Sequence, residues 1–302
     1  MSGAAVPAPV KEAGGGAARP ERVGVGPHAV RKVVVDIEPG DGFRSVDTRE
    51  LWRFRELLYF LVWRDVKIRY KQTALGAAWA VLQPVLTMTV FALFLGRLAR
   101  VPSDGIPYPL FAFVALVPWT YFATAVGSGA VSIVTSQSLI SKVYFPRLLV
   151  PLAATLTPLV DFTIAMVTLV ALLAWYHVMP GSAIVWLPLF VALAVATALA
   201  ATLWLAALTV RYRDVRHVVP FFVQFWMLAT PVAYPASLVP ARWRILYGLN
   251  PMTGVIEGFR WTLVRGPRPA SLVVVSAAVV TALIASGLLF FRRAEGTFAD
   301  VI

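Results

Sequence analysis

The stretch RELLYFLVWRDVKIRYKQTALGAAWAVLQP, residues 55–84, decides the fold. Its first half is aromatic and densely charged, whereas from Ala74 onward it carries no charge. A basic helix with an aromatic stripe is typical of the membrane interface, where the rings lie at headgroup depth and the cations stay hydrated. We therefore predict an interfacial amphipathic helix over residues 46–72, after which the chain enters the bilayer. At helical spacing the stripe is Tyr59, Val62, Trp63, Val66 and Tyr70. The candidate interfacial residues are Tyr59, Trp63, Arg64, Lys67 and Tyr70.

The composition agrees with a membrane protein. The chain has 302 residues, of which 59% are hydrophobic and 14% charged, and its mean hydropathy of +0.76 is too high for an ordinary water-soluble domain. The net charge of +12 does not indicate nucleic-acid binding, because the basic residues flank apolar segments and are better explained by membrane orientation. The absence of cysteine excludes disulfides, thiolate metal sites and a cysteine nucleophile.

Six apolar segments are long enough to cross a hydrocarbon core of roughly 30 Å. They cover about residues 74–96, 107–130, 148–176, 183–210, 218–239 and 270–291. The expected fold is therefore an all-α membrane protein. We expect residues 1–45 to form a flexible cytoplasmic tail without a signal peptide, and residues 73–302 to form a six-span transmembrane domain.

Loop charges predict the orientation. If both termini are cytoplasmic, most of the 27 Lys and Arg residues lie on the cytoplasmic side, as the positive-inside rule requires. Lys142 and Arg147 follow the second span, and Arg292 and Arg293 follow the last. We expect a multi-pass protein with both termini inside.

Residues 241–266, ARWRILYGLNPMTGVIEGFRWTLVRG, are too short and too charged to span a bilayer and too apolar for a hydrated loop. Asn250 followed by Pro251 predicts a helix N-cap with proline at the first helical position. Glu257 and Arg260, three residues apart, are placed to pair on that helix. We expect a re-entrant segment that dips into the outer leaflet before the last span.

Two features within the spans are candidates for function. Asp161 is an acid inside an apolar span, and burying an ionisable group there is energetically costly. It therefore has either a role in the transport pathway or in a conformational change, or a structural hydrogen bond to a neighbouring helix. Aromatic residues on the second and fifth spans either stack on sugar rings in a substrate path or form lipid-facing belts. The candidate path residues are Trp119, Tyr121, Phe122, Phe222, Phe225, Trp226 and Tyr234.

The chain lacks the patterns of an enzyme. It has no glycine-rich phosphate-binding loop of the G-x-x-x-x-G-K-[ST] type. Its histidines, His28, His177 and His217, are far apart in the sequence, so neither a metal site nor a catalytic triad is predicted. We expect no catalytic residues and no cofactor on this chain.

The loop SIVTSQSLISKVYFPR, residues 132–147, has Ser136 or Ser138 as a helix cap and Pro146 as a stop, and predicts about two turns of helix on the cytoplasmic side. It is either a plain connector between the second and third spans or a docking element. A short capped helix fixed between two long spans can transmit a displacement from a bound partner to those spans, which favours the docking interpretation.

Three of these stretches resemble one family. Residues 55–84, KVYFPRLLVPLA after the second span, and YGLNPMTGVIEGFRWTLVRG before the last are similar to permease subunits of type-2 ABC exporters. These exporters move O-antigen, capsule, teichoic acid and related polysaccharides, and the resemblance covers about residues 50–295. It implies a homodimer in the bacterial inner membrane, bound to two copies of a cytoplasmic ABC ATPase that carry ATP and Mg²⁺, with a lipid-linked glycan as cargo and no nucleic acid. The residues expected to couple to the ATPase are Ser138, Leu139, Ile140, Ser141 and Lys142.

Two other classes stay open. A membrane-embedded glycosyltransferase of the same pathway requires catalytic acids near a membrane face, and the scattered carboxylates speak against it. An ion-coupled carrier requires inverted repeats and several buried charges, for which Asp161 alone is thin support.

Overall fold

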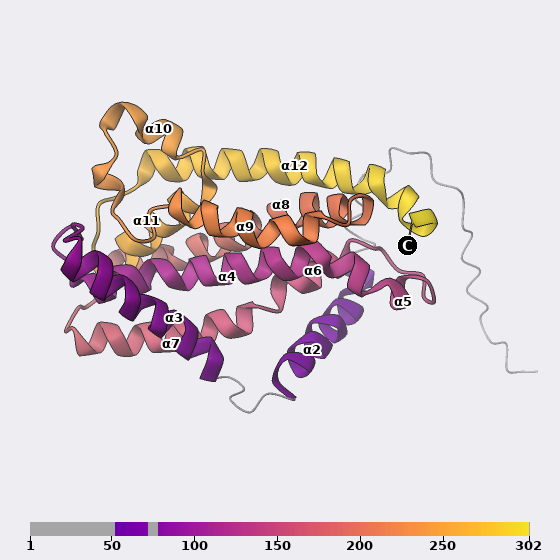
Figure 1. Ribbon diagram of the computed structural model, residues 1–302, viewed down its shortest axis with the longest axis horizontal. Coiled ribbons are helices and arrows are strands. Elements are labelled where there is room, and N and C mark those ends of the chain that lie inside the picture. The colour runs from indigo at the N-terminus through magenta and orange to yellow at the C-terminus, as the bar shows by residue number, and fades with distance from the viewer. Residues whose placement is uncertain (1–51, 72–77, 302) are drawn as a thin grey trace, which may run out of the picture. The chain divides into compact units, whose positions relative to one another are not determined.

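The computed structural model describes residues 52–71 and 78–301, and these residues contain helices and loops but no strand (Figure 1). The predicted tail, residues 1–45, and the first residues of the predicted interfacial segment lie outside the described residues. The long elements are α2 (Arg55–Lys71), α3 (Ala78–Phe91) continuing as a π-helix (Ala92–Leu98), α4 (Tyr108–Thr135), α6 (Leu149–Leu156), α7 (Leu159–Trp175), α8 (Leu187–Arg211), α9 (Val215–Leu228), α11 (Pro251–Val264) and α12 (Ala270–Val301). The short ones are α5 (Gln137–Ile140), α10 (Arg244–Tyr247), and 3₁₀ turns at Ser182–Trp186, Ala236–Leu238 and Ala241–Trp243.

Five described helical segments are long and apolar enough to cross a membrane. They are Ala78–Leu98, Tyr108–Thr135, Leu149–Trp175, Ser182–Arg211 and Ala270–Gly296. Each coincides within a few residues with a predicted span, so the all-helical class and five of the six spans are confirmed as helices.

The predicted fifth span, 218–239, has a different structure. Its helix, α9, has 14 residues and ends at Leu228, so at 1.5 Å per residue it is roughly 21 Å long and shorter than the hydrocarbon core. Pro231 and Pro235 follow this end, and a proline cannot donate the backbone bond that would continue a helix. The remaining residues form turns, and the count of six spans stays a prediction.

The predicted third span is two helices. α6 ends at Leu156 and α7 begins at Leu159, with Pro158 at the junction. This break places Asp161 in the first turn of α7. The amide groups of a helix N-terminus favour negative charge, which offsets part of the cost of a carboxylate at this depth.

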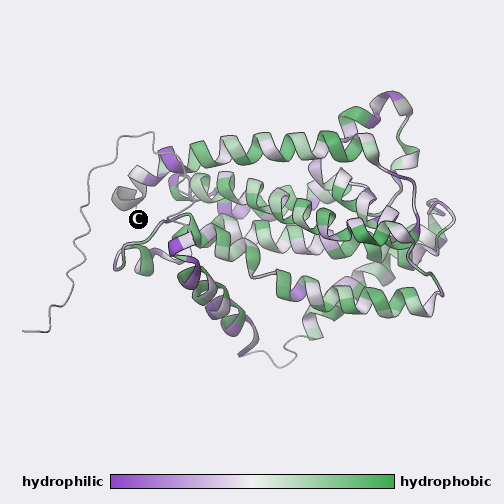
Figure 2. Cartoon of the chain, turned by 180° about the vertical axis from the view of Figure 1, so that it is seen from behind, coloured by the Kyte–Doolittle hydropathy of each residue, from purple (hydrophilic) through white to green (hydrophobic). Residues whose placement is uncertain are grey.

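α4 is the centre of the bundle. It packs against α3, α6, α7, α8, α9 and α11, and every side chain from Leu110 to Trp119 is buried. Gly129 allows α8 to approach, because a Cβ at this position would lie 2.4 Å from the Thr202 side chain. Figure 2 shows the long helices coloured mainly as hydrophobic, with hydrophilic residues concentrated on α2 and near the helix ends. Apolar side chains are exposed along these helices, for example Leu86 of α3, Val167 of α7 and Val274 of α12. Apolar outer surfaces are what a bilayer requires.

Candidate functional site

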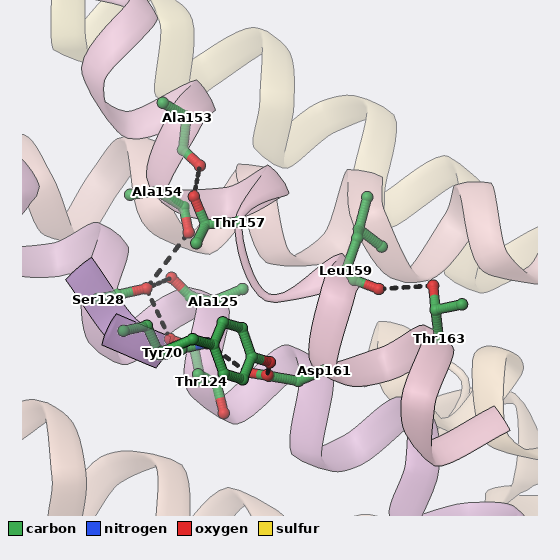
Figure 3. Close-up of polar contacts among 11 residues, drawn as sticks. Tyr70, Thr124, Ala125, Ser128, Ala153, Ala154, Thr157, Leu159, Asp161 and Thr163 are labelled. Atoms are coloured by element: carbon green, nitrogen blue, oxygen red, sulfur yellow. Dashed lines mark hydrogen bonds and ion pairs between the residues drawn. The ribbon is translucent and has the colours of Figure 1, made fainter. Parts of the chain in front are cut away.

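Asp161 is held by two residues of α2. The Arg69 guanidinium forms a salt bridge with its carboxylate, and the Tyr70 hydroxyl donates a hydrogen bond to its other oxygen. Figure 3 shows the Tyr70 ring and Asp161 facing each other. Burial and the bond to Asp161 raise the pKa of Tyr70 to about 12, so the phenol remains a donor at neutral pH. The partners lie 91 and 92 residues from Asp161 in the sequence, and sequence reasoning missed them.

The junction of Arg69, Tyr70 and Asp161 lies beside a cavity of about 230 Å³. This cavity, called here the α3-side cavity, is bounded by α2, α3, α4 and α7, and its lining includes Trp79, Gln83, Thr120, Tyr121 and Thr124. A second cavity of about 580 Å³, the α5-side cavity, lies between α2, α4, α5 and α6. Its lining includes Arg64, Asp65, Ser128, Ser132, Thr135, Ser138 and Thr157. Hydroxyl groups are thus concentrated along this wall of the bundle.

The predicted interfacial residues do not share one face of α2. Tyr59 and Trp63 are exposed, with their rings stacked 6.5 Å apart, and the Lys67 ammonium lies 5.3 Å from the Trp63 ring. Arg64 pairs with Asp65 at 2.9 Å, whereas Tyr70 turns into the protein. The face that packs on the bundle instead carries Phe54, Leu57, Leu58, Leu61 and Val62. The exposed Tyr59 and Trp63 are compatible with an interfacial position of α2, which stays a prediction.

The candidate path aromatics fall into a buried and an exposed group. Trp119, Tyr121 and Phe122 of α4 lie in the core, with Phe122 0% exposed, and Trp226 of α9 contacts Phe122 with ring centroids 5.0 Å apart. Phe222 and Phe225 of α9 are exposed, Phe225 to 70%. The Tyr234 hydroxyl lies 2.7 Å from that of Tyr247. Among these candidates, Phe222 and Phe225 of α9 are exposed outside the subunit core.

The candidate coupling segment forms a single helical turn, α5, rather than two turns. Ser136 is its N-cap by position but makes no side-chain capping bond. Leu139 and Ile140 are half-buried against the cluster that contains Leu61 and Phe145. The projecting residues are Ser138, Ser141, Lys142, Val143 and Tyr144, with Tyr144 72% exposed. Val143 and Tyr144 were missed, although they lie in the stretch that the sequence indicated.

The candidate re-entrant segment has both predicted features. The Asn250 side chain accepts a bond from the Met252 amide at 3.1 Å, as an N-cap does, and the Glu257–Arg260 salt bridge forms at 2.8 Å. α11 is buried at 13 positions and lies among α4, α8 and α12. With 14 residues it is too short to cross the bilayer, and Figure 1 shows it at the end of the bundle where α4 begins. Its position relative to a membrane stays a prediction.

Within 52–71 and 78–301 no three His, Asp or Glu residues gather to hold a metal ion. The family profile described as ABC-2 type transporter matches residues 56–264, from α2 to the end of α11. This chain belongs to the ABC-2 type transporter family. The match includes the junction at Asp161, the α5 segment and the buried pair of α11.

The curated relatives of this transporter include exporter subunits. It is 35% identical over 260 residues to the O-antigen export system permease protein RfbA of Myxococcus xanthus, an alignment that covers 84% of this chain and 98% of the relative. Two Klebsiella pneumoniae proteins with the same name are each 24% identical, with 82% of this chain and 95% of the relative covered. The predicted family is thereby confirmed, and the chain is a multi-pass membrane subunit of a transporter rather than itself an enzyme.

Proposed function

We propose that this transporter is the membrane subunit of an ATP-driven exporter that moves a lipid-linked polysaccharide from the cytoplasmic side across the inner membrane. The observation that supports this most is the alignment over 98% of a relative named as an O-antigen export permease. Because the alignment extends over nearly the whole relative, it includes the regions that would carry cargo and those that would contact an ATPase.

The proposed assembly contains two copies of this chain and two copies of a cytoplasmic ATPase that binds ATP and Mg²⁺. The loop from Gln137 to Tyr144 is the proposed docking element, because it projects from the bundle between two long helical segments. Leu139 and Ile140 anchor the loop to the bundle, and Val143 and Tyr144 offer an exposed apolar and aromatic contact. This distribution supports a refinement of the predicted docking set, in which Leu139 and Ile140 position the loop and the exposed residues bind.

The proposed cargo path runs between the two copies. Phe222 and Phe225 on α9 support this location, because their exposed rings can stack on the C–H faces of successive sugars. Trp119 and Phe122 of α4 stand behind α9, and Trp226 of α9 packs on Phe122 and holds the helix in place. The proposed orientation has both termini in the cytoplasm, with α11 as a re-entrant helix at the outer side.

A test of the function uses cells in which the gene for this chain is deleted. Loss of surface polysaccharide with accumulation of lipid-linked glycan inside the cell, restored by the gene, is the expected result. Unchanged surface polysaccharide would contradict the proposal. Glycan loss without intracellular lipid-linked intermediates would favour the glycosyltransferase class instead.

The docking element is tested by copurification of the ATPase with the purified permease. The double substitution Val143→Asp and Tyr144→Asp is expected to abolish copurification, since a charge on each contact residue opposes desolvation of the interface. Met179→Asp is the matched control, because Met179 is similarly exposed and lies in the loop between α7 and α8. If the double variant still copurifies with the ATPase, the docking site lies elsewhere on the chain.

A further inference from the structure

The α3-side and α5-side cavities lie end to end along one wall of the bundle. Thr124 of α4 lines the α3-side cavity, and Ser128, one turn further along α4, lines the α5-side cavity. At the junction of α6 and α7 two adjacent residues are divided in the same way. Thr157 lines the α5-side cavity, and Pro158 lines the α3-side cavity. Figure 3 shows this region, with Ser128 and Thr157 on one side of the Tyr70–Asp161 contact.

Arg69 lines both cavities. It reaches the boundary from the C-terminal end of α2 and forms its salt bridge there with Asp161 of α7. Tyr70 reaches the same carboxylate and also lines the α3-side cavity. Arg69 therefore lies at the boundary between the two cavities, and Tyr70 and Asp161 adjoin it from the α3-side cavity.

We propose that the junction of Arg69, Tyr70 and Asp161 is a gate, which closes the passage between the α5-side and α3-side cavities at rest and opens during transport. The three side chains come from two elements, α2 and α7, so a displacement of α2 relative to α7 separates them. Because an unpaired charge at this depth is costly, the closed gate is stable, and opening requires that water or cargo replaces the contacts.

α2 is placed to receive a displacement from the cytoplasmic loop. Its Leu57, Leu58 and Leu61 belong to the cluster against which Leu139 and Ile140 of α5 pack. The α5-side cavity is itself bounded by Leu61 and Leu139. This shared cluster offers a route by which a force on α5 could reach α2, whose far end carries Arg69 and Tyr70.

The lining residues indicate which class of molecule the opened passage would accept. Serine and threonine hydroxyls, together with the aromatic faces of Trp79 and Tyr121, suit a polyhydroxylated chain better than an alkyl chain. Arg64 is paired with Asp65 and Arg69 with Asp161, so the wall has little net charge. This assignment of the cargo rests on the proposed function, in which the gated passage would be an entrance to the path between the two copies. The gate itself does not rest on it.

The absence of cysteine in this chain allows a direct test of the gate. Thr124→Cys places a thiol in the α3-side cavity, and Thr135→Cys places one in the α5-side cavity. Both variants are treated with a membrane-impermeant methanethiosulfonate reagent in inside-out vesicles, with the complete transporter and without nucleotide. With an intact gate, the thiol at position 135 is expected to react rapidly and the thiol at position 124 slowly.

Asp161→Leu removes both acceptor contacts at similar volume and is expected to accelerate labelling at position 124 by about tenfold or more, since both contacts that hold this part-buried junction closed end on Asp161. Asp161→Glu, which keeps both acceptors, is expected to retain slow labelling, and labelling at position 135 should not change. Arg69→Gln provides a second opening variant if Asp161→Leu does not insert.

Two outcomes would overturn the gate. The first is fast labelling at position 124 in the parent with Asp161 and Arg69 intact. The second is labelling at position 124 that stays slow in every opening variant that inserts, whether Asp161→Leu or Arg69→Gln. The labelling rates can be measured without any cargo. If the gate behaves as expected but the gene deletion leaves surface polysaccharide unchanged, the proposed function fails and the gate stands.

Discussion

The Arg260 guanidinium lies 2.8 Å from the Glu257 carboxylate within a helix that is enclosed by protein. Both side chains are almost completely buried, and the same guanidinium lies 3.7 Å from the centroid of the Phe111 ring of α4. It also donates to the Val232 carbonyl at 3.0 Å. The pair therefore connects α11 to α4 and to the turn that follows α9.

Glu257→Gln is expected to destabilise the folded protein by about 3–5 kcal/mol, because it leaves the Arg260 charge buried without its counter-ion. The double variant Glu257→Gln and Arg260→Met should be less destabilised than the single variant. Denaturant titration in detergent micelles measures both. Glu295→Gln, at a partly exposed pair with Arg292, is the control and should change stability by less than about 1 kcal/mol. Equal losses at the two sites would contradict burial of the α11 pair.

Gly258→Ala is expected to destabilise the bundle by about 1–3 kcal/mol through overpacking. A Cβ at this position would lie 2.0 Å from the Phe190 ring of α8. Gly127→Ala is the matched control, because nothing lies within 4 Å of its Cβ position and the change favours helix formation. Thermal unfolding of the purified protein compares the two. A neutral Gly258→Ala would show that α11 and α8 do not pack this closely.

Phe122→Ala is expected to affect stability, whereas Phe225→Ala is expected to affect export. Phe122 is fully buried, so its truncation should reduce stability by about 3–5 kcal/mol. Phe225 is exposed, so its truncation should leave stability nearly unchanged and reduce glycan export. Export per inserted molecule, measured beside thermal unfolding, separates the two effects. Normal export by both Phe222→Ala and Phe225→Ala would place the path away from α9.

Asn250→Ala is expected to cost about 1–2 kcal/mol through the helix cap alone. It also removes the acceptor of the Trp226 indole, 2.9 Å away, and the donor to the Thr230 hydroxyl at 2.8 Å. Asn250→Asp keeps the acceptor and should retain more of the stability. The chain has ten tryptophans, so the Trp226 signal is taken as the fluorescence difference between each protein and its Trp226→Phe derivative. An unchanged difference spectrum in the alanine variant would argue against the contact.

Local patterns predict local structure well in this chain. The Asn250 cap and the Glu257–Arg260 pair depend on spacings of two and three residues, which a helix fixes without help from the rest of the fold. The long apolar segments likewise predict five helical spans, since length and hydropathy are sufficient for that inference. Pro231 indicates a break, but its position does not reveal that α9 ends as early as Leu228.

Tertiary contacts are not predictable in the same way. The aromatic stripe of α2 predicts one organising face, yet the leucines at 57, 58 and 61 face the bundle. Both sets have helical spacing, and only the packing partner decides between them. The position of Asp161 in an apolar span predicts that it needs a partner, but the choice of Arg69 and Tyr70 depends on how α2 lies against α7, which no local pattern contains.

The enclosure of α11 imposes an order on biogenesis. Part of its covering surface is α12, which approaches closely at Gly254, where a Cβ would be 2.5 Å from the Ser276 hydroxyl. Because α12 follows α11 in the chain, it emerges from the ribosome later, and α11 cannot reach its buried state while the nascent chain still ends before Ala270. Until then a short helix with a charge pair must be sheltered by the insertion machinery or wait at the membrane surface. Synthesis of α12 is thus the step that allows α11 to become buried.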